Sequence, residues 1–387
     1  MNKKIIIVGP AYPYRGGQPL VEAYLHKTIT SLGYDTNTIS YKLLYPKVFF
    51  PGKTQYDNSK FIPFEHNNNI QRLLNSINPF SWWKTYKQIK KEKPDVVIIV
   101  WWMFFFGPCL GSLSFLIKHF MKQTKICFLI ENYISHENHF FEKIIVKQTL
   151  KYAHCFIAES HYIYNEISKD FPKAKIYETT LSVFDIYNMN RYDKQSAREF
   201  LGIKNKNVLL FFGLIRKYKG LDALLYAMPK VLEQKPDTKL MIVGECYEDF
   251  TKYQNIIDSL HLNDSIMIEQ KFIANEDVEP YFKACDYVVM PYHSATQSGI
   301  LMMAYGFRRP VIATNVGGMG ELVNEKTGLI IENNSQQILS SSIVEMLEKK
   351  EEVDYGANIE EFIQNIGYNN INKILSDLTT KNIGTNE

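Results

Sequence analysis

Short apolar runs alternate with helical patterns along almost the whole chain. In the first half, the runs that predict buried strands lie at 4–8, 96–100, 126–130 and 155–158, with shorter ones at 36–41 and 175–178. The helical patterns between them lie at 19–32, 79–92, 138–152 and 161–168. Strands that alternate with helices form parallel sheets, because the chain must return along one face of the sheet before the next strand pairs. The first half therefore predicts a parallel sheet with helices on both faces.

The second half repeats this alternation from Val208 onward. Its predicted strands lie at 208–212, 239–243, 266–268, 287–290, 311–313 and 329–331, and its predicted helices at 221–234, 249–260, 278–283, 300–306 and 337–348. A chain of 387 residues is also longer than the ~250–300 residues that one hydrophobic core organises. We therefore expect an α/β protein of two Rossmann-like domains whose parallel sheets face each other across a cleft, at residues 1–182 and 183–365.

Two strand ends in the second half have the same local design. The strand at 207–212 is followed by Arg216 and Lys219 before a helix begins, and the strand at 287–290 is followed by a small polar loop that enters a helix near Ile300. Ligands of open α/β sheets bind at the carboxyl ends of the strands. Helix N-termini and guanidinium groups both favour phosphate there. Either segment alone is typical of an ordinary strand–loop–helix turn, but the pair predicts an anion site.

The same residues carry a resemblance to glycosyltransferase family 4, whose members are retaining enzymes with the two-domain GT-B fold. In the second half the similar motifs are Gly213-Leu-Ile-Arg-x-x-Lys-Gly220, the run 299–310 and Pro310-Val-Ile-Ala-Thr-x-Val-Gly-Gly-x-x-Glu321. In the first half the motifs that resemble a bacterial subset of the family are Pro13-Tyr-Arg-Gly-Gly17, Phe50-Pro-Gly-Lys-Thr54, Asn78-Pro-Phe-Ser-Trp82 and Asn132-Tyr-Ile-Ser-His-Glu137. The resemblance spans residues 3 to about 340.

The resemblance implies an enzyme, a glycosyltransferase of the hexosyltransferase type. It would move a sugar from a UDP- or GDP-linked donor to a saccharide or lipid-linked saccharide acceptor, in bacterial surface polysaccharide synthesis. The donor is a substrate, and no cofactor is expected. No metal is expected either, because the sequence lacks an Asp-x-Asp motif and its nine histidines form no metal-binding pair. The resemblance also implies that residues 366–387 form a terminal helix crossing back to the first domain, followed by a tail.

The resemblance and the loop chemistry together assign the site residues. Arg216 and Lys219 would neutralise the charge that builds on the leaving diphosphate. His136 or Glu137, which follow the strand at 126–130, would orient the acceptor hydroxyl or accept its proton; the alternative for His136 is a helix-start residue bonded to backbone. The expected donor-binding residues are Gly16, Gly17, Gly213, Phe272, Thr296, Gln297, Ser298, Gly299 and Glu321. For Gly16 and Gly17 the alternative is a plain glycine turn before a helix.

The chain departs from the family at two acidic positions. Family members usually carry two glutamates, with seven residues between them, ahead of the proline that is Pro310 here. Those positions hold Ala295 and Met303. In addition, Glu131 stands where the subset usually has histidine. Either this subset binds its donor through hydroxyl, amide and backbone groups, which we favour, or the chain is a non-catalytic nucleotide-sugar binding protein. A GT-B sugar-nucleotide epimerase is a third interpretation.

Charge, cysteine content and apolar runs set the remaining expectations. A net charge of +3 is too small to indicate a nucleic acid partner. Five scattered cysteines without metal-binding spacing suit reduced thiols in the cytoplasm. The apolar run 96–110 is shorter than the roughly 20 residues of a spanning helix, and it predicts a buried strand followed by an aromatic loop. The sequence determines neither the donor sugar and nucleobase, nor the acceptor and linkage, nor the oligomeric state.

The helix predicted at 79–92 suggests a weak membrane contact. One of its faces carries Trp82, Trp83, Tyr86 and Ile89, and another carries Lys84, Lys87 and Lys91. Tryptophans beside lysines suit a helix in an anionic lipid interface, which predicts peripheral attachment at the inner face of the plasma membrane. The alternative is that the aromatic face packs on the sheet while the lysines face water.

Overall fold

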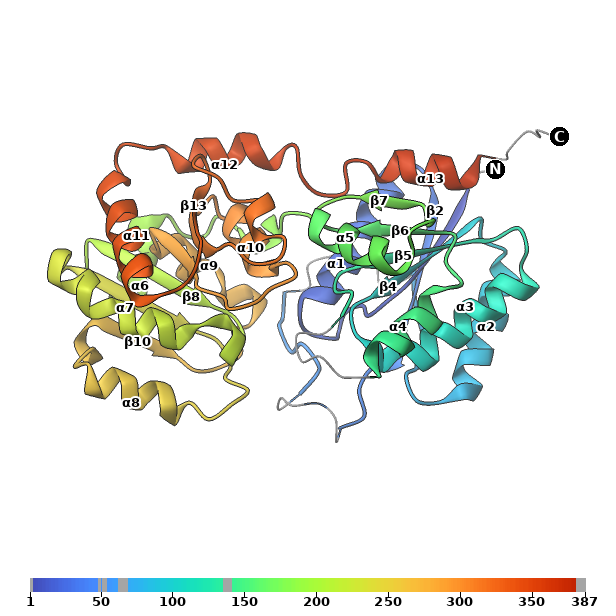
Figure 1. The fold of residues 1–387 in the computed structure, drawn as a ribbon, viewed down its shortest axis with the longest axis horizontal. Coiled ribbons are helices and arrows are strands. Elements are labelled where there is room, and N and C mark those ends of the chain that lie inside the picture. Colours follow the sequence, from blue (N-terminus) through green and yellow to red (C-terminus); the bar gives the residue numbers. More distant parts are fainter. Residues whose placement is uncertain (1–2, 48–49, 51–53, 62–68, 135–140, 381–387) are drawn as a thin grey trace. The chain divides into compact units, whose positions relative to one another are not determined.

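The computed structural model describes residues 3–47, 50, 54–61, 69–134 and 141–380 (Figure 1). It divides into two compact units, each of which is described by itself. The first unit is formed by Met1–Asp57, Phe64–Ser182 and Ile366–Glu387, and the second by Asn58–Pro63 and Val183–Asn365.

The first unit is built on a seven-stranded parallel sheet. Its strands are β1 (Lys4–Val8), β2 (Asp35–Leu43), β3 (Ile70–Asn75), β4 (Val96–Trp101), β5 (Lys125–Ile130), β6 (Cys155–Ala158) and β7 (Ile176–Glu178). They pair in the order β3-β2-β1-β4-β5-β6-β7. All six residues of β4 are buried, as expected of an unbroken Val/Ile run in a sheet covered on both faces. The flanking helices are α1 (Gly17–Ser31), α2 (Pro79–Glu92), α3 (Gly107–Phe120), α4 (Glu142–Leu150), α5 (His161–Asp170) and α13 (Ile371–Thr379).

Two elements of this unit differ from the sequence prediction. The aromatic loop expected up to residue 110 is wrong, because a short 3-10 turn at Phe104–Phe106 leads straight into α3 at Gly107. Pro108 does not end the apolar run but occupies the first helical turn, where its missing N–H has no helical acceptor to lose. Strand β3 was missed because its Gln71 and Arg72 interrupt the apolar pattern.

The second unit contains a six-stranded parallel sheet. Its strands are β8 (Asn207–Phe212), β9 (Thr238–Val243), β10 (Ile266–Glu269), β11 (Tyr287–Met290), β12 (Val311–Thr314) and β13 (Gly328–Ile331), in the order β10-β9-β8-β11-β12-β13. The helices are α6 (Lys194–Phe200), α7 (Leu221–Gln234), α8 (Thr251–Ser259), α9 (Glu279–Ala284), α10 (Gly299–Gly306), α11 (Gln336–Lys349) and α12 (Tyr355–Ile363). The sequence missed α6, a helix of seven residues that starts at a capping box between Asp193 and Ser196.

The two sheets share one topological feature. In each, the strand order reverses beside the first strand, between β1 and β4 in one sheet and between β8 and β11 in the other. The loops that follow strands at such a switch point are where ligands of doubly wound sheets bind. The α/β class and the pair of Rossmann-like sheets are therefore confirmed, and each sheet has a defined edge at which to look for a site.

Two segments belong to a different unit from the chain that surrounds them. Residues 58–61, which fall within the range 1–182 expected for the first domain, belong to the second unit, where Asn275 N donates to Ser59 Oγ (2.9 Å). The carboxylate of Glu276 accepts from the N–H groups of Lys60 (3.0 Å) and Phe61 (3.3 Å). The terminal helix α13 packs in the first unit, where its Asp377 pairs with Lys175 (3.1 Å).

In the described part of the chain, no helix combines the length and the apolar character that a membrane span requires.

Candidate functional site

The loop after β8 is shaped by two glycines. Gly213, which ends the strand, has φ 98°, and Gly220, which opens α7, has φ 66°. Both values lie in the left-handed region that glycine adopts without steric cost. A Cβ at Gly220 would lie 2.0 Å from the Pro291 carbonyl oxygen, so glycine is also needed for close contact with the loop after β11.

The loops after β8 and β11 meet, because these two strands are neighbours in the sheet. His293 N donates to the Tyr218 carbonyl (2.7 Å), which ties the two backbones together. A Cβ at Gly213 would lie 3.1 Å from both Lys219 Nζ and Ile300 Cδ1. The lysine head and the start of α10 therefore come together over a bare glycine backbone, where a ligand can approach closely.

Lys219 is the most unusual charged group at this edge. Only 7% of its surface is exposed, and its Nζ lies 5.5 Å from the centroid of the Tyr292 ring. Burial lowers the pKa of Lys219 to about 7, and the charge of Arg216 adds to the shift. Within the described part of the chain, neither cation forms an ion pair with a carboxylate. A buried ammonium without a counter-charge is costly, so this position favours an anionic ligand.

Arg216 lies in the same loop and is half-buried. Its guanidinium carbon lies 5.1 Å from the centroid of the Tyr247 ring, which supports the planar group on one side. Lys219 N donates to the Arg216 carbonyl (2.9 Å), so the backbone turn holds the two cations in one loop.

The N-terminus of α10 adds backbone donors. The first intrahelical bonds run from Leu301 N (3.1 Å) and Met302 N (3.3 Å) to the Ser298 carbonyl. The earlier N–H groups, of Gly299 and Ile300, have no intrahelical acceptor. Ser298 provides no side-chain cap, because its hydroxyl is hydrogen-bonded to Tyr292. These amides and the positive end of the helix dipole favour an anion beside Lys219.

The polar loop before α10 contains an unsatisfied amide. Both side-chain atoms Nε2 and Oε1 of Gln297 are buried and have no hydrogen-bond partner among the described residues. A buried polar group left without a partner costs about 1–3 kcal/mol, so a ligand that bonded to Gln297 would recover this cost. Thr296 is buried, and its carbonyl accepts from Gly318 N (2.9 Å), which joins this loop to the one after β12.

Two expected donor-binding residues lie further along the same edge. Phe272 follows β10, two strands away from β8, and is 37% exposed. Glu321 ends the short 3-10 turn after β12 and is exposed. The structure thus brings together Gly213, Arg216, Lys219, Ser298 and Gly299, with Thr296 and Gln297 beside them, and places Phe272 and Glu321 at flanking strand ends.

The corresponding edge of the first unit begins with a glycine turn. Gly16 has φ 113° and precedes the first residue of α1, Gly17, at which an added Cβ would meet nothing within 4 Å. The positive φ suits the predicted glycine turn, and the open space at Gly17 leaves room for a ligand. His136 and Glu137 lie outside the described residues, as does the segment 51–53 of one family-like motif.

A pair of buried carboxyl groups lies at this edge and was missed as a pair by the sequence analysis. Glu131 and Glu159 follow the neighbouring strands β5 and β6. Burial raises the pKa of Glu159 to about 8. Burial, and then the charge of Glu159, raises the pKa of Glu131, against a hydrogen bond from Gln18. Tyr368 Oη donates to Glu159 Oε1 (2.7 Å). The only signal in the sequence is that each glutamate directly follows a buried apolar strand.

The carboxyl pair also has unused hydrogen-bonding capacity. Glu131 Oε1 and Glu159 Oε2 are buried without a partner among the described residues. A carboxyl with a raised pKa keeps its proton near neutral pH, so this edge can donate a hydrogen bond from an acid as well as accept one.

The region around Lys219 is similar to a known protein family. Residues 206–349 match the family of glycosyl transferases group 1. This region holds Gly213, Lys219, Gly299 and the other residues that meet at the strand ends of the second sheet. Over 94% of its length, the chain is 25% identical to the uncharacterized glycosyltransferase MJ1069 of Methanocaldococcus jannaschii, covering 95% of that protein.

Other curated relatives match the chain over shorter segments. The putative glycosyltransferase YtcC of Bacillus subtilis is 28% identical over 204 residues, which cover 48% of this chain and 49% of YtcC. The spore coat protein SA of the same organism is 26% identical over 45% of this chain and 50% of its own length. The chain thus spans about half the length of these two relatives.

Solved structures resemble the chain over nearly its whole length. Sucrose-phosphate synthase from Thermosynechococcus elongatus superposes with a TM-score of 0.72 at 17% identity, covering 97% of this chain and 98% of that one. Anabaena Alr3699/HepE, solved with UDP, gives a TM-score of 0.73 at 16% identity, with 97% and 98% covered. Likeness at this identity shows the fold, and the predicted GT-B fold is confirmed.

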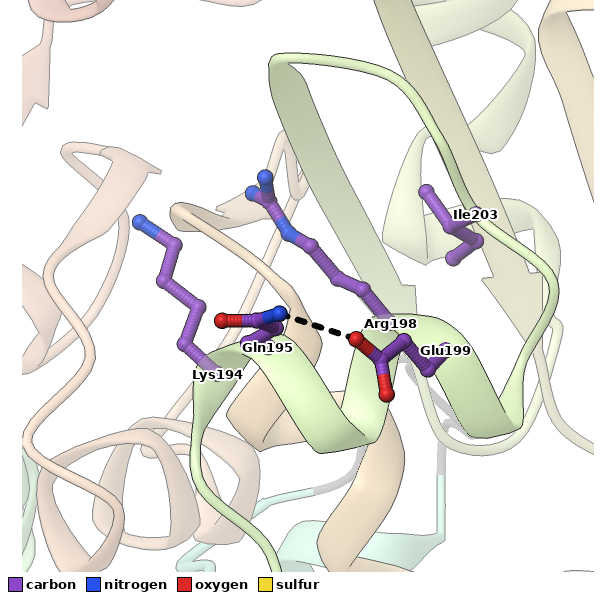
Figure 2. A pocket seen from close by; sticks show the side chains of 5 residues that line it. All are labelled: Lys194, Gln195, Arg198, Glu199 and Ile203. Carbon is purple, nitrogen blue, oxygen red and sulfur yellow. Dashed lines mark hydrogen bonds between the residues drawn. The ribbon is translucent and has the colours of Figure 1, made fainter.

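A separate pocket in the second unit differs from the edge around Lys219 in the partners of its cations. It has a volume of about 380 Å³ and is lined by Lys194, Gln195, Arg198, Glu199 and Ile203 (Figure 2). Both of its cations are paired with Asp286, Lys194 at 2.6 Å and Arg198 at 2.9 Å. Because both cations share a carboxylate partner within the protein, the pocket lacks the cations without a carboxylate partner that are found around Lys219.

Among the described residues, no three His, Cys, Asp or Glu side chains are arranged to hold a metal ion.

Proposed function

We propose that this protein is a retaining glycosyltransferase of the hexosyltransferase type. It transfers a sugar from a UDP- or GDP-linked donor to a saccharide or lipid-linked saccharide acceptor in the synthesis of a bacterial surface polysaccharide. The observation that carries the proposal is Lys219, a buried cation without a carboxylate partner among the described residues, at a strand switch point. The group 1 match over residues 206–349 supports the activity. The structures of HepE with UDP and with UDP-glucose support a nucleotide-sugar donor.

The donor diphosphate occupies the space between Lys219, Arg216 and the N-terminus of α10. Negative charge grows on the diphosphate as the glycosidic bond breaks, and fixed cations and amides stabilise that charge without reorganising. Bound diphosphate also favours the charged form of Lys219, whose pKa is lowered to about 7 mainly by burial. Donor binding at pH values above about 7 is therefore accompanied by proton uptake.

Neutral groups bind the donor where the family usually has two glutamates. Ala295 and Met303, at the corresponding positions, are 6% and 7% exposed and belong to the packed core. The unpartnered amide of Gln297 lies two residues after Ala295 and accepts or donates to a hydroxyl of the donor. Phe272 and Glu321 contribute from the flanking strand ends.

The acceptor attacks from the same face as the departing diphosphate, and the leaving phosphate oxygen takes the acceptor proton. Arg216, Lys219 and the α10 amides supply the positive charge, so the proposal requires no metal ion. Gly16 and Gly17 leave room for the acceptor or the diphosphate, and His136 or Glu137 orients the acceptor hydroxyl. The protonated Glu131–Glu159 pair donates to a sugar oxygen at the same edge of the first unit.

A panel of UDP-, GDP- and ADP-sugars tests the proposal. The purified protein is incubated with each donor, with and without saccharide acceptors, and the products are separated by mass spectrometry. Slow hydrolysis or transfer with retained anomeric configuration supports the proposal. Formation of an epimer without an acceptor supports a GT-B epimerase instead, and binding without turnover supports a nucleotide-sugar binding protein.

A further inference from the structure

Exposed aromatic side chains gather on two neighbouring helices of the first unit. Phe80 and Trp83 on α2 are 81% and 47% exposed, and Phe120 at the end of α3 is 59% exposed. Tyr86 links Trp83 to Phe120, since its ring centroid lies 5.3 Å from that of Trp83 and 6.4 Å from that of Phe120. Helices α2 and α3 pack side by side (Figure 1). Large apolar side chains this exposed and this close together mark an interaction surface.

The aromatic face predicted for α2 is partly buried and partly exposed in the structure. Tyr86 and Ile89 are 3% and 0% exposed and pack into the unit, as the core interpretation expected. Trp83 instead points outward, together with Phe80 one turn earlier. The helix therefore meets its own unit with one side and still presents aromatic groups to the surroundings.

The polar part of the same surface is positively charged. Lys84, Lys87, Lys90 and Lys91 are exposed on α2, and none of them forms an ion pair with a carboxylate in the described part of the chain. The one acidic residue of α2, Glu92, is bonded to Lys4 (3.0 Å), and its side chain is only 9% exposed. We call Phe80, Trp83, Phe120 and these four lysines the α2–α3 face.

The lysines and the aromatic rings of this face are neighbours. Lys87 Nζ lies 5.5 Å from the centroid of the Trp83 ring, and Lys90 Nζ lies 5.9 Å from that of Tyr86. Their aliphatic stems thus run along apolar surface while the charged ends stay in water, the arrangement of side chains at a membrane interface.

We propose that the α2–α3 face docks on the surface of an anionic phospholipid bilayer. Phe80, Trp83 and Phe120 enter the headgroup region, and the four lysines contact lipid phosphates. Charge complementarity selects this partner, since unpaired cations beside exposed aromatic rings match a surface that is anionic outside and apolar beneath. The attachment is peripheral and sensitive to salt, and it does not depend on which reaction the protein performs.

Co-sedimentation with vesicles tests the proposal. The protein is mixed with vesicles of phosphatidylcholine, alone or with a third of phosphatidylglycerol, at low and at high salt. We expect binding to the anionic vesicles at low salt, and at least about tenfold weaker binding to pure phosphatidylcholine or at high salt. A protein that stays in the supernatant under all conditions, or binds both vesicle types equally, overturns the proposal.

Two variants and a matched control locate the surface. Lys84→Glu/Lys87→Glu/Lys91→Glu should abolish binding, and Phe80→Ser/Trp83→Ser should weaken it by about tenfold. The control Lys204→Glu/Lys230→Glu/Lys326→Glu reverses three exposed lysines of the second unit and makes the same change in net charge. Circular dichroism and thermal melting verify that each variant is folded. Equal loss of binding in the control and the α2 variant would show a non-specific charge effect and overturn the assignment to this face.

Discussion

The two sheets have the same strand order around their switch points, but the loops after their strands carry different ionisable groups. In the second unit, the loop after β8 carries Arg216 and Lys219, cations without carboxylate partners among the described residues. In the first unit, β5 and β6 end in Glu131 and Glu159, whose pKa values are raised by burial. Strand order thus gives both sheets a similar edge, while a few side chains give the two edges opposite electrostatic character.

The largest expected effect concerns the two cations in the loop after β8. Lys219→Ala or Arg216→Ala should lower turnover of a sugar nucleotide by ten- to a thousand-fold, about 1.4–4 kcal/mol, because the leaving diphosphate loses a preorganised positive charge. Lys217→Ala is the matched control, since Lys217 lies in the same loop but is exposed. Initial rates at saturating donor measure the effect. Rates within twofold of the parent for both site variants would remove the donor site from this loop.

The second prediction concerns the effect of Glu159 on the pH dependence of stability. The folded Glu159 keeps its proton up to a pKa of about 8, whereas an unfolded glutamate releases it near its ordinary pKa of 4.5, so stability falls as pH rises between these values. Glu159→Gln retains an acceptor for Tyr368 and needs no proton. It should therefore raise the free energy of unfolding by about 1–3 kcal/mol at pH 8 and by less at pH 5.

Urea denaturation at pH 5, 6.5 and 8 measures this dependence. Glu325→Gln, at an exposed carboxylate, serves as the control and should leave the pH dependence of the parent unchanged. A Glu159→Gln protein that is less stable than the parent at pH 8 would mean that Glu159 is ionised and paired in the folded state.

A third prediction asks whether the glycine turn of the first unit faces a ligand. Gly17→Val should lower turnover by about tenfold while changing the melting temperature little, because an added side chain meets open space and not packed protein. Gly356→Val, also in the first turn of a helix, should leave turnover unchanged. A Gly17→Val protein that melts early yet keeps full activity in its folded fraction would show that the glycine is structural.

The smallest expected effect concerns the amide that replaces the missing acids. Gln297→Ala should weaken donor binding by about three- to tenfold, the equivalent of one neutral hydrogen bond, without destabilising the free protein. Isothermal titration calorimetry with the nucleotide sugar measures the affinity. Gln337→Ala, on the exposed start of α11, is the control. Unchanged affinity for Gln297→Ala would leave the role of the two usual glutamates unfilled.

The fold was largely predictable because its signals are local. Apolar runs such as 96–100 predicted buried strands, and the glycines at 213 and 220 indicated the turn that brings Lys219 to the edge of the sheet. The wrong predictions also had local causes. Polar residues interrupt the apolar pattern of β3, and Pro108 indicated a break at a position where a helix begins. The burial of Lys219 and the pairing of Glu131 with Glu159 could not be predicted from the sequence, because both depend on elements that meet only after the chain has folded.

The assignment of segments to units has a consequence for how the protein is made. The chain passes between the units at 57–58, 63–64, 182–183 and 365–366. The first unit lacks α13, and Glu159 lacks its Tyr368 partner, until the last part of the chain leaves the ribosome. The second unit in turn needs Ser59, which is synthesised long before the strands it packs against. Neither unit corresponds to one continuous stretch that can be cut from the gene, so expression of residues 183–365 alone leaves Asn275 and Glu276 without the backbone they bind.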